Sequence, residues 1–364
     1  MKKIFNNWSE ACTKTSLIVL LLSSVQRAQE LSSSMYNLSE RYGPVVTVYL
    51  GPQRAVALIG YEAVKDALVN QGDDFTGRGP LPFFMKVTNG LAISNGERWR
   101  QLRHFTLTTL KDFGMGRKGM EQWIQEESKY LVARIHGTKA SPFDPTYFLS
   151  CSVSNVICCL VFGQRFDYND DHFLHLLDFA FFHPHPLCLQ LYDIFPQLME
   201  CLPGRHHKLF TGIEELKKFI RKNIQEHEDT LDMSSPRDYI DCFLTRANME
   251  KDLPTTEFNN DNLVPTVLNL FAAGTDSTSS TIKFALSVLS KYPKIQEKMQ
   301  QEIDTVIGRN RDPFMQDRKS LPFTDAVLHE IQRFMDFVPM GVPHYTLRDI
   351  LFRSYRIPKV FGNI

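Results

Sequence analysis

The sequence predicts a mainly helical protein with a small β portion. Three observations lead to this prediction: a β-rich hairpin near residue 50, long stretches of helical periodicity after it, and proline or glycine between those stretches. Of the 364 residues, 43% are hydrophobic, which is enough to bury a core and excludes a disordered chain. We find no internal repeat and no long linker, so we expect one large unit rather than several domains.

The β portion comes first along the chain. Residues 45–50 (VVTVYL) and 54–59 (RAVALI) are rich in β-branched residues and enclose a Gly-Pro turn, which predicts a hairpin. A helix is expected over residues 61–70, where four apolar residues share one face. Residues 350–357 return to a strand-like composition, and Pro358 ends that run.

The rest of the chain is expected to be largely helical. Apolar residues recur at helical spacing in nine further stretches. These are residues 97–110, 120–136, 147–162, 171–182, 212–228, 238–248, 262–290, 293–307 and 324–336.

The amino-terminal segment does not match a standard anchor or signal. Its apolar run, residues 17–22, is far shorter than the about 20 residues that span a bilayer, and no clean cleavage site follows it. We therefore separate an atypical leader, residues 1–35, from a domain over residues 36–364.

Charge and cysteine content exclude two classes of protein. Lysine and arginine total 41 and so do aspartate and glutamate, so the chain is neutral and is not expected to bind nucleic acid. Seven cysteines are an odd number without zinc-type spacing, which favours buried thiols over a disulfide framework.

The longest predicted helix contains an unusual polar run, GTDSTSST at residues 274–281. Short polar side chains are poor helix formers, so the run is either a loop between two helices or a helix opened beside a ligand. In the second interpretation Asp276, Ser277 and Thr278 relay protons, and Gly274 lets the ligand approach the backbone. A serine hydrolase built on Asp276 and Ser277 ranks last, because no Gly-x-Ser-x-Gly elbow is present.

Two pairs of residues, each within one predicted helix, could bind a ligand or stabilise the fold. Trp99 and Arg103 lie at i, i+4, which sets an indole N–H beside a guanidinium, a pair suited to a carboxylate. Glu330 and Arg333 lie at i, i+3 and can form an ion pair, and their apolar neighbours suggest that it is at least partly buried.

Two further donors stand in restricted segments. Arg78 follows a glycine, and His344 follows a proline. Taken singly, each of these residues is more often a packing or surface residue than a ligand contact.

Together and in this order, the motifs of the chain resemble those of the cytochrome P-450 family, the haem-thiolate monooxygenases, in its vertebrate microsomal group that oxidises drugs and lipids. The resemblance runs from about Leu38 to about Lys359. The matching segments are YGP (42–44), YLGP (49–52), FTGR (75–78), NGERWRQLR (95–103), FGQRFDY (162–168), AGTDST (273–278), KYP (291–293), LPFTDA (321–326), ExxR (330–333) and VPH (342–344).

The resemblance implies a P-450-like fold and a haem b cofactor. It implies that Arg78, Trp99, Arg103 and His344 hold the haem propionates, with Ala273 and Gly274 against the cofactor. Asp276, Ser277 and Thr278 would guide protons to iron-bound dioxygen, and Glu330 and Arg333 would belong to a buried network near the haem.

The implied reaction inserts one atom of O₂ into apolar small molecules such as xenobiotics, fatty acids or steroids. Electrons would come from NADPH through a flavoprotein reductase, with cytochrome b5 as a further partner. The implied location is the cytoplasmic face of the endoplasmic reticulum membrane.

The chain departs from the family at the iron ligand. The family binds iron through a cysteine in a Phe-x-x-Gly-x-x-x-Cys-x-Gly loop. The seven cysteines here lie between positions 12 and 242, none in that context, so no metal ligand is assigned. The expectation is a fold that lacks its carboxy-terminal haem-cysteine segment. The alternative to an oxygenase is an inactive family member that binds a ligand or a partner.

Two smaller departures follow. Ser277 stands where the family has threonine, so the hydroxyl is kept but the methyl that restricts its rotamers is lost. Residues 181–188 contain two prolines where a substrate-covering helix is expected, so no substrate is named.

Overall fold

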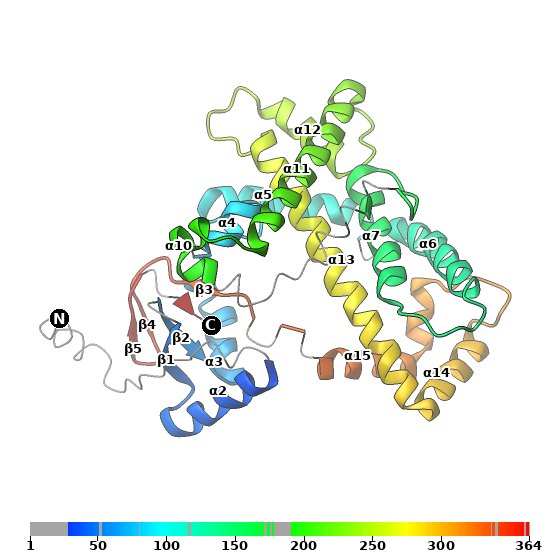
Figure 1. The fold of residues 1–364 in the computed structure, drawn as a ribbon, viewed down its shortest axis with the longest axis horizontal. Helices are drawn as coiled ribbons and strands as arrows, with labels where there is room; N and C mark the ends of the chain where they lie inside the picture. Colours follow the sequence, from blue (N-terminus) through cyan, green and yellow to red (C-terminus); the bar gives the residue numbers. More distant parts are fainter. Residues whose placement is uncertain are drawn as a thin grey trace, which may run out of the picture.

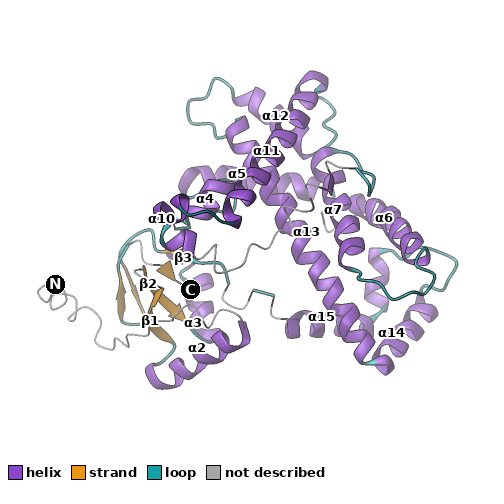
Figure 2. Ribbon diagram, viewed as in Figure 1, coloured by secondary structure: helices purple, strands orange, loops and turns teal. Residues whose placement is uncertain are grey.

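The computed structural model describes residues 28–50, 53–79, 81–115, 118–170, 173–174, 177, 191–335, 337–338, 341–359 and 362–363. The strands gather at one side of the molecule with helices α2 (Ala28–Tyr42) and α3 (Tyr61–Lys65), and most other helices are arranged around the long helix α13 (Asn260–Lys291) (Figure 1). Helices make up much more of the described chain than strands do (Figure 2). The predicted fold class is confirmed.

The main sheet joins the two ends of the described chain. Strands β1 (Val45–Leu50) and β2 (Gln53–Leu58) form the predicted antiparallel hairpin, with Val45 opposite Leu58. Strand β6 (Gly362–Asn363) runs parallel to β2 and antiparallel to β3 (His344–Tyr345), which gives the order β1-β2-β6-β3. This pairing brings His344 to the sheet formed by residues 45–58.

The hairpin is apolar on both faces, and both faces are covered. Val46 and Val48 pack with Met35 of α2, whereas Val45 and its neighbours pack with Phe75. Successive side chains of a strand point to opposite faces, so the near-continuous apolar run in residues 45–50 matches a strand buried on two sides.

The strand-like run at residues 350–357 is a second hairpin rather than one strand. Its strands β4 (Ile350–Phe352) and β5 (Tyr355–Ile357) are joined by Arg353 and Ser354, whose φ angles are 46° and 69°. A two-residue hairpin turn requires positive φ and usually carries glycine or asparagine. Arginine and serine give no such signal, which is why the prediction missed the turn.

The predicted helices that the structure describes are confirmed, with ends shifted by up to seven residues, except that the stretch 61–70 divides into α3 and a π-helical turn. The remaining helical elements are η2 (Asp66–Asn70), η3 (Gly72–Phe75), α4 (Pro82–Thr88), α5 (Gly96–Asp112), α6 (Lys118–His136), α7 (Thr146–Phe162), α10 (Pro196–Cys201), α11 (Arg205–Thr230), α12 (Tyr239–Glu250), α14 (Pro293–Val306), η4 (Met315–Ser320) and α15 (Pro322–Met335). The prediction missed α2, α4 and α10. The predicted helix at 171–182, the prolines at 181–188 and residues 1–27 lie largely or wholly outside the described residues.

Helix α13 continues through the polar run, so the loop interpretation is wrong. Ser277 Oγ donates to the carbonyl of Ala273 at 2.7 Å, and Thr281 Oγ1 donates to that of Ser277 at 2.7 Å. The hydroxyls are thus satisfied by carbonyls one turn back in the same helix. On the opposite face, buried Thr275 accepts from Ser154 Oγ of α7 at 3.1 Å.

Gly274 serves the packing of α13 against α7. A Cβ atom at this position would lie 2.7 Å from Cδ1 of Ile157. The missing side chain therefore lets two helices approach, as small residues do at close crossings. The expected approach of a ligand to Gly274 stays a prediction.

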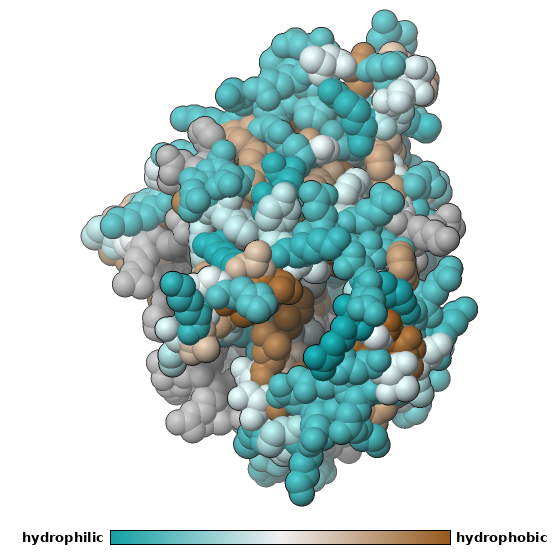
Figure 3. All heavy atoms as spheres, turned by 90° about the vertical axis from the view of Figure 1, so that its right-hand side faces the viewer, coloured by the Kyte–Doolittle hydropathy of each residue, from teal (hydrophilic) through white to brown (hydrophobic). Residues whose placement is uncertain are grey.

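The surface is mixed in polarity. On the side that faces right in Figure 1, hydrophilic side chains surround a hydrophobic hollow (Figure 3). No helix in the described part of the chain has an apolar stretch long enough to cross a bilayer.

Candidate functional site

The segment that carries Arg78 packs against strand β3. Tyr345 N donates to the carbonyl of Gly77 at 2.7 Å. A Cβ on Gly77 would lie 2.5 Å from the Tyr345 carbonyl oxygen, and one on Gly79 would lie 1.9 Å from the Tyr345 ring. Only glycine therefore fits on either side of Arg78 without a shift of the backbone or the ring.

The Arg78 guanidinium faces a histidine that cannot accept from it. His344 Nδ1 lies 2.6 Å from the carbonyl oxygen of Phe75, which can only accept, so this nitrogen carries the proton. The same nitrogen lies 3.0 Å from Arg78 Nη1. Two donors thus face each other, and the only other protein acceptor near that Nη1 is the Pro343 carbonyl at 3.5 Å, counting described residues alone.

Burial and neighbouring positive charge lower the pKa values of both Arg78 and His344. Burial, and then the positive charge of Arg103, lower the pKa of Arg78. Burial, and then the charge of Arg78, lower the pKa of His344, against the opposing effect of its hydrogen bond to Phe75. The imidazole is therefore neutral at pH 7 in the absence of an anion.

Helix α5 supplies the other two predicted residues. Trp99 and Arg103 lie one turn apart, and the Arg103 guanidinium is 5.4 Å from the centre of the indole ring. The prediction that they share a face is confirmed. The structure places Arg78 beside His344 and Arg103 beside Trp99, and Asn95, at the start of the helix that carries Trp99 and Arg103, hydrogen-bonds to the backbone of Arg78. We refer to Arg78, Trp99, Arg103 and His344 as the arginine group.

The group has positive charge without a matching carboxylate. Arg100, on the same helix, pairs with Glu97 at 3.7 Å. Neither Arg78 nor Arg103 forms an ion pair with a carboxylate in the part of the chain that the structure describes. Guanidinium groups, an indole N–H and an imidazole N–H can each donate a hydrogen bond to a carboxylate.

The polar run of α13 forms a second, separate group. Asp276 Oδ1 accepts from Ser280 Oγ at 3.2 Å, while Thr278 and Ala273 are exposed. No hydrogen bond between described residues connects Asp276, Ser277 or Thr278 with the arginine group. Because Ser277 donates its proton to Ala273, its oxygen presents only lone pairs to any other partner.

The Glu330–Arg333 pair forms, but it is not buried. Two bonds of 2.7 Å join the side chains, which are 63% and 71% exposed respectively. Their apolar neighbours Leu328 and Phe334 are themselves exposed, and Ile331 is the residue of α15 that is buried. The expectation of partial burial is wrong because apolar composition does not fix which face of a helix packs.

Three residues that were not predicted as site residues, Asn95, Phe75 and Tyr345, make hydrogen bonds that position the arginine group. Asn95 Oδ1 accepts from Arg78 N and Asn95 Nδ2 donates to the Arg78 carbonyl, both at 2.6 Å. Phe75 and Tyr345 contribute the contacts described above. Asn95 carried the signal of a helix start, but nothing local indicates a partner 17 residues away.

Burial keeps four of the described cysteines, Cys151, Cys158, Cys159 and Cys242, in the thiol form. Burial raises the pKa of Cys151 and Cys158, and it raises the pKa of Cys159 and of Cys242 to about 11. Their charged neighbours, such as Glu127 and Asp238, do not belong to the arginine group. Cys12 and Cys188 lie outside the described residues.

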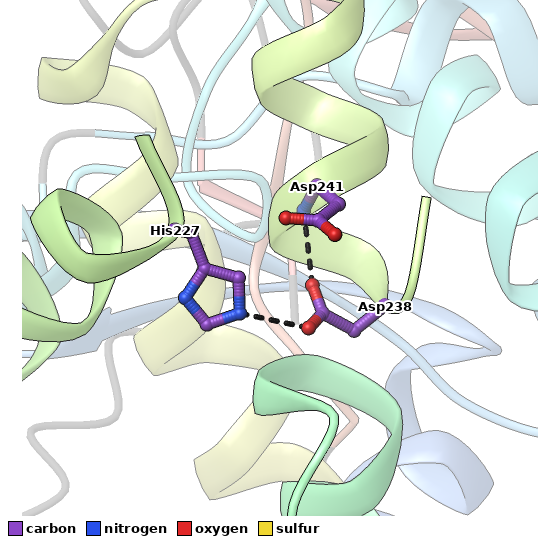
Figure 4. A group of neighbouring side chains, drawn as sticks. All are labelled: His227, Asp238 and Asp241. Carbon is purple, nitrogen blue, oxygen red and sulfur yellow. Dashed lines mark hydrogen bonds and ion pairs between the residues drawn. The ribbon is translucent and has the colours of Figure 1, made fainter. Parts of the chain in front are cut away.

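A buried cluster of His227, Asp238 and Asp241 has ligand atoms within 4.8 Å of one another, but the protein satisfies them itself (Figure 4). His227 Nε2 lies 2.8 Å from Asp238 Oδ2, and its Nδ1 lies 2.6 Å from the Asn223 carbonyl. Asp238 Oδ1 caps α12 by accepting from Asp241 N, and Arg237 binds both oxygens of Asp241. The cluster is therefore a structural link between α11 and α12.

The protein is mainly helical with a small sheet, and its Arg78 and Arg103 have no carboxylate partner among the described residues. A family model described as Cytochrome P450 matches residues 12–360, and the chain belongs to this family of haem-dependent monooxygenases.

Several family members are similar over most of the chain. Cytochrome P450 2C20 of Macaca fascicularis is 49% identical over 336 residues, 91% of this chain and 69% of that protein. Cytochrome P450 2C8 of Homo sapiens is 45% identical over 368 residues, 98% and 75% of the two chains. Cytochrome P450 2G1 of Oryctolagus cuniculus is 50% identical over 338 residues, 92% and 68%.

Proposed function

We propose that Arg78, Trp99, Arg103 and His344 bind the two propionates of a haem. The observation that supports this most directly is the pair of arginines without a carboxylate partner among the described residues. A haem carries two carboxylates, so its arrival would satisfy both guanidinium groups through charge-assisted hydrogen bonds.

His344 would respond to the same ligand. A neighbouring carboxylate favours the protonated imidazole. Nε2 could then donate to the propionate while Nδ1 keeps its bond to the Phe75 carbonyl. Binding at this site would therefore be accompanied by proton uptake.

When bound, haem iron supplies the activation of O₂ that leads to insertion of one oxygen atom into an apolar small molecule. On α13, Asp276 would hold and release the proton for this step, and Thr278 offers an exposed hydroxyl. Ser277 would accept a hydrogen bond from a proton carrier, because its own proton is donated to Ala273.

The proposal predicts that the purified chain prefers iron protoporphyrin IX to its dimethyl ester, which lacks the charged carboxylates. A hydrogen bond to a charged group contributes about 1.5–3 kcal/mol, so the free acid should bind at least about tenfold more tightly. Titrations followed by the Soret band and by quenching of tryptophan fluorescence measure both affinities. Equal affinities would contradict the propionate site.

The second candidate is binding of haem or another apolar ligand without oxygen chemistry. It is favoured by the raised pKa values of Cys151, Cys158, Cys159 and Cys242, because an iron-binding cysteine must be a thiolate. The reduced, carbon monoxide-treated protein distinguishes the two. A thiolate-type Soret band supports the oxygenase, and bound haem without that band supports the binding role.

We also propose, from similarity to the relatives above, that a flavoprotein reductase and cytochrome b5 are partners and that the chain lies on the cytoplasmic face of the endoplasmic reticulum membrane. The neutral net charge argues against a nucleic-acid partner. Cell fractionation checks the location, and exclusion from the microsomal fraction would contradict it.

A further inference from the structure

Asn95 occupies the N-cap position of α5 but does not cap this helix with its side chain. Asparagine is favoured at this position because its side-chain oxygen accepts from an amide of the first turn. Asn259 does this on α13, where it accepts from Asn262 N at 3.0 Å. The Asn95 side chain instead binds Arg78 N and the Arg78 carbonyl, both at 2.6 Å.

This pairing connects the two halves of the arginine group. Asn95, Trp99 and Arg103 follow one another at intervals of four residues, so they lie along one side of α5. Arg78 belongs to the segment that is bound on its other side to β3 through Gly77 and Tyr345. Asn95 therefore joins the backbone of Arg78 directly to the helix that carries Arg103.

The connection acts against a repulsion. Arg103 lowers the pKa of Arg78, which means that the two positive charges disfavour each other at their present separation. No carboxylate among the described residues compensates them. The two hydrogen bonds between the Asn95 side chain and the Arg78 backbone oppose a separation of this segment from α5.

We propose that Asn95 is a positioning residue that holds Arg78 at the distance from Arg103 needed to bind the two propionates of one porphyrin. The proposal rests on the proposed function, because it assigns to Asn95 the preorganisation of the propionate site. Preorganised donors bind more tightly because their ordering cost is met before the ligand arrives.

The test compares iron protoporphyrin IX with its dimethyl ester in the full chain and in Asn95→Ala. We expect the substitution to weaken free-acid binding about tenfold and to leave ester binding unchanged, so the preference between the two ligands falls by the same factor. Asn259→Ala is the matched control. This substitution removes the side-chain hydrogen bond of an ordinary N-cap on another helix, so it tests for a general loss of helix stability. It should not change the preference for the free acid over the ester.

Asn95→Ser provides a second variant if Asn95→Ala folds poorly. Serine is a good N-cap residue, yet its side chain is too short to make both bonds to Arg78. It should therefore fold and still lose the preference.

The other outcomes of this test distinguish a failure of the propionate site from a failure of the role of Asn95. No preference in the unsubstituted chain overturns the proposed propionate site itself. A normal preference that survives in Asn95→Ala and Asn95→Ser overturns the role of Asn95 alone, as does an equal loss of affinity for both ligands.

Discussion

His344 donates from Nδ1 to the Phe75 carbonyl and so meets Arg78 as a second donor. The position of this one proton explains why the guanidinium is not satisfied by its nearest neighbour. The sequence predicted that Arg78 and His344 are ligand donors, but it could not predict that they face each other, since they are 266 residues apart.

Arg103→Ala should weaken binding of iron protoporphyrin IX about tenfold to a hundredfold, because it removes one charge-assisted hydrogen bond to a carboxylate. Binding titrations of the free acid measure the change. Arg100→Ala is the control, because Arg100 lies on the same helix, is exposed, and already pairs with Glu97. If the two substitutions weaken binding equally, Arg103 acts only through the general charge of α5.

At the scale of elements, helix α13 resolves the ambiguity of its polar run. Hydroxyls at 277 and 281 bond to the preceding turn, and Thr275 meets Ser154 across the contact with α7. Helix propensity alone could not decide between helix and loop, because the compensating partners of Thr275 and Gly274 lie on another helix. The polar run is helical, and Gly274 packs closely against Ile157 of α7, while its role toward a ligand stays a prediction.

Gly274→Ala should lower the free energy of unfolding by about 1 kcal/mol, although alanine alone would favour the helix by a similar amount, because overpacking costs about 1–3 kcal/mol. The new Cβ would meet Cδ1 of Ile157 at 2.7 Å. Denaturant unfolding of the apo chain measures the effect.

Adding Ile157→Val removes that Cδ1 atom and should recover most of the loss. Ile157→Val alone should cost about 0.5–1.5 kcal/mol. Strictly additive effects of the two substitutions would show that the side chains do not meet.

Sequence patterns predicted some elements well and others poorly, for identifiable reasons. Long amphipathic stretches such as α6 and α14 were located within a few residues. The short helices α4 and α10 were missed, since six or seven residues complete at most two turns of a periodic pattern. The hairpin of β4 and β5 was missed because its turn uses Arg353 and Ser354.

At the scale of the whole molecule, the His227–Asp238 contact joins α11 to α12 beside the end of α7. Gly163 ends α7 with a φ of 66°, and a Cβ there would lie 2.7 Å from Asp238 Oδ2. Asp238 therefore fits among three helices, and both imidazole nitrogens of His227 face acceptors. Such an arrangement favours the doubly protonated imidazole.

The stability of the chain should therefore fall as the pH rises above neutrality. Burial opposes the charge of His227, but the hydrogen bond and charge of Asp238, the Asn223 carbonyl and the charge of Asp241 together raise its pKa. The stabilisation is complete below about 6.5, the ordinary pKa of histidine, and is lost as the pH rises through the raised value. Urea unfolding between about pH 5.5 and 8.5 measures this slope.

His227→Gln should flatten the slope over that range. The matched control is His136→Gln, because His136 is exposed at the end of α6 and should leave the slope unchanged. A slope that persists in His227→Gln would assign the pH dependence to other groups.

The sequence by itself determined the family, the helical class, the hairpin and the identities of the charged and aromatic residues at the candidate site. These follow from spacing along the chain, which sets helix faces and motif order. Only the tertiary structure decided that Asn95 binds Arg78, that His344 donates to Phe75, and that Glu330 and Arg333 are exposed. Burial and the choice of hydrogen-bond partner depend on which distant segments pack together, and local spacing carries no record of that packing.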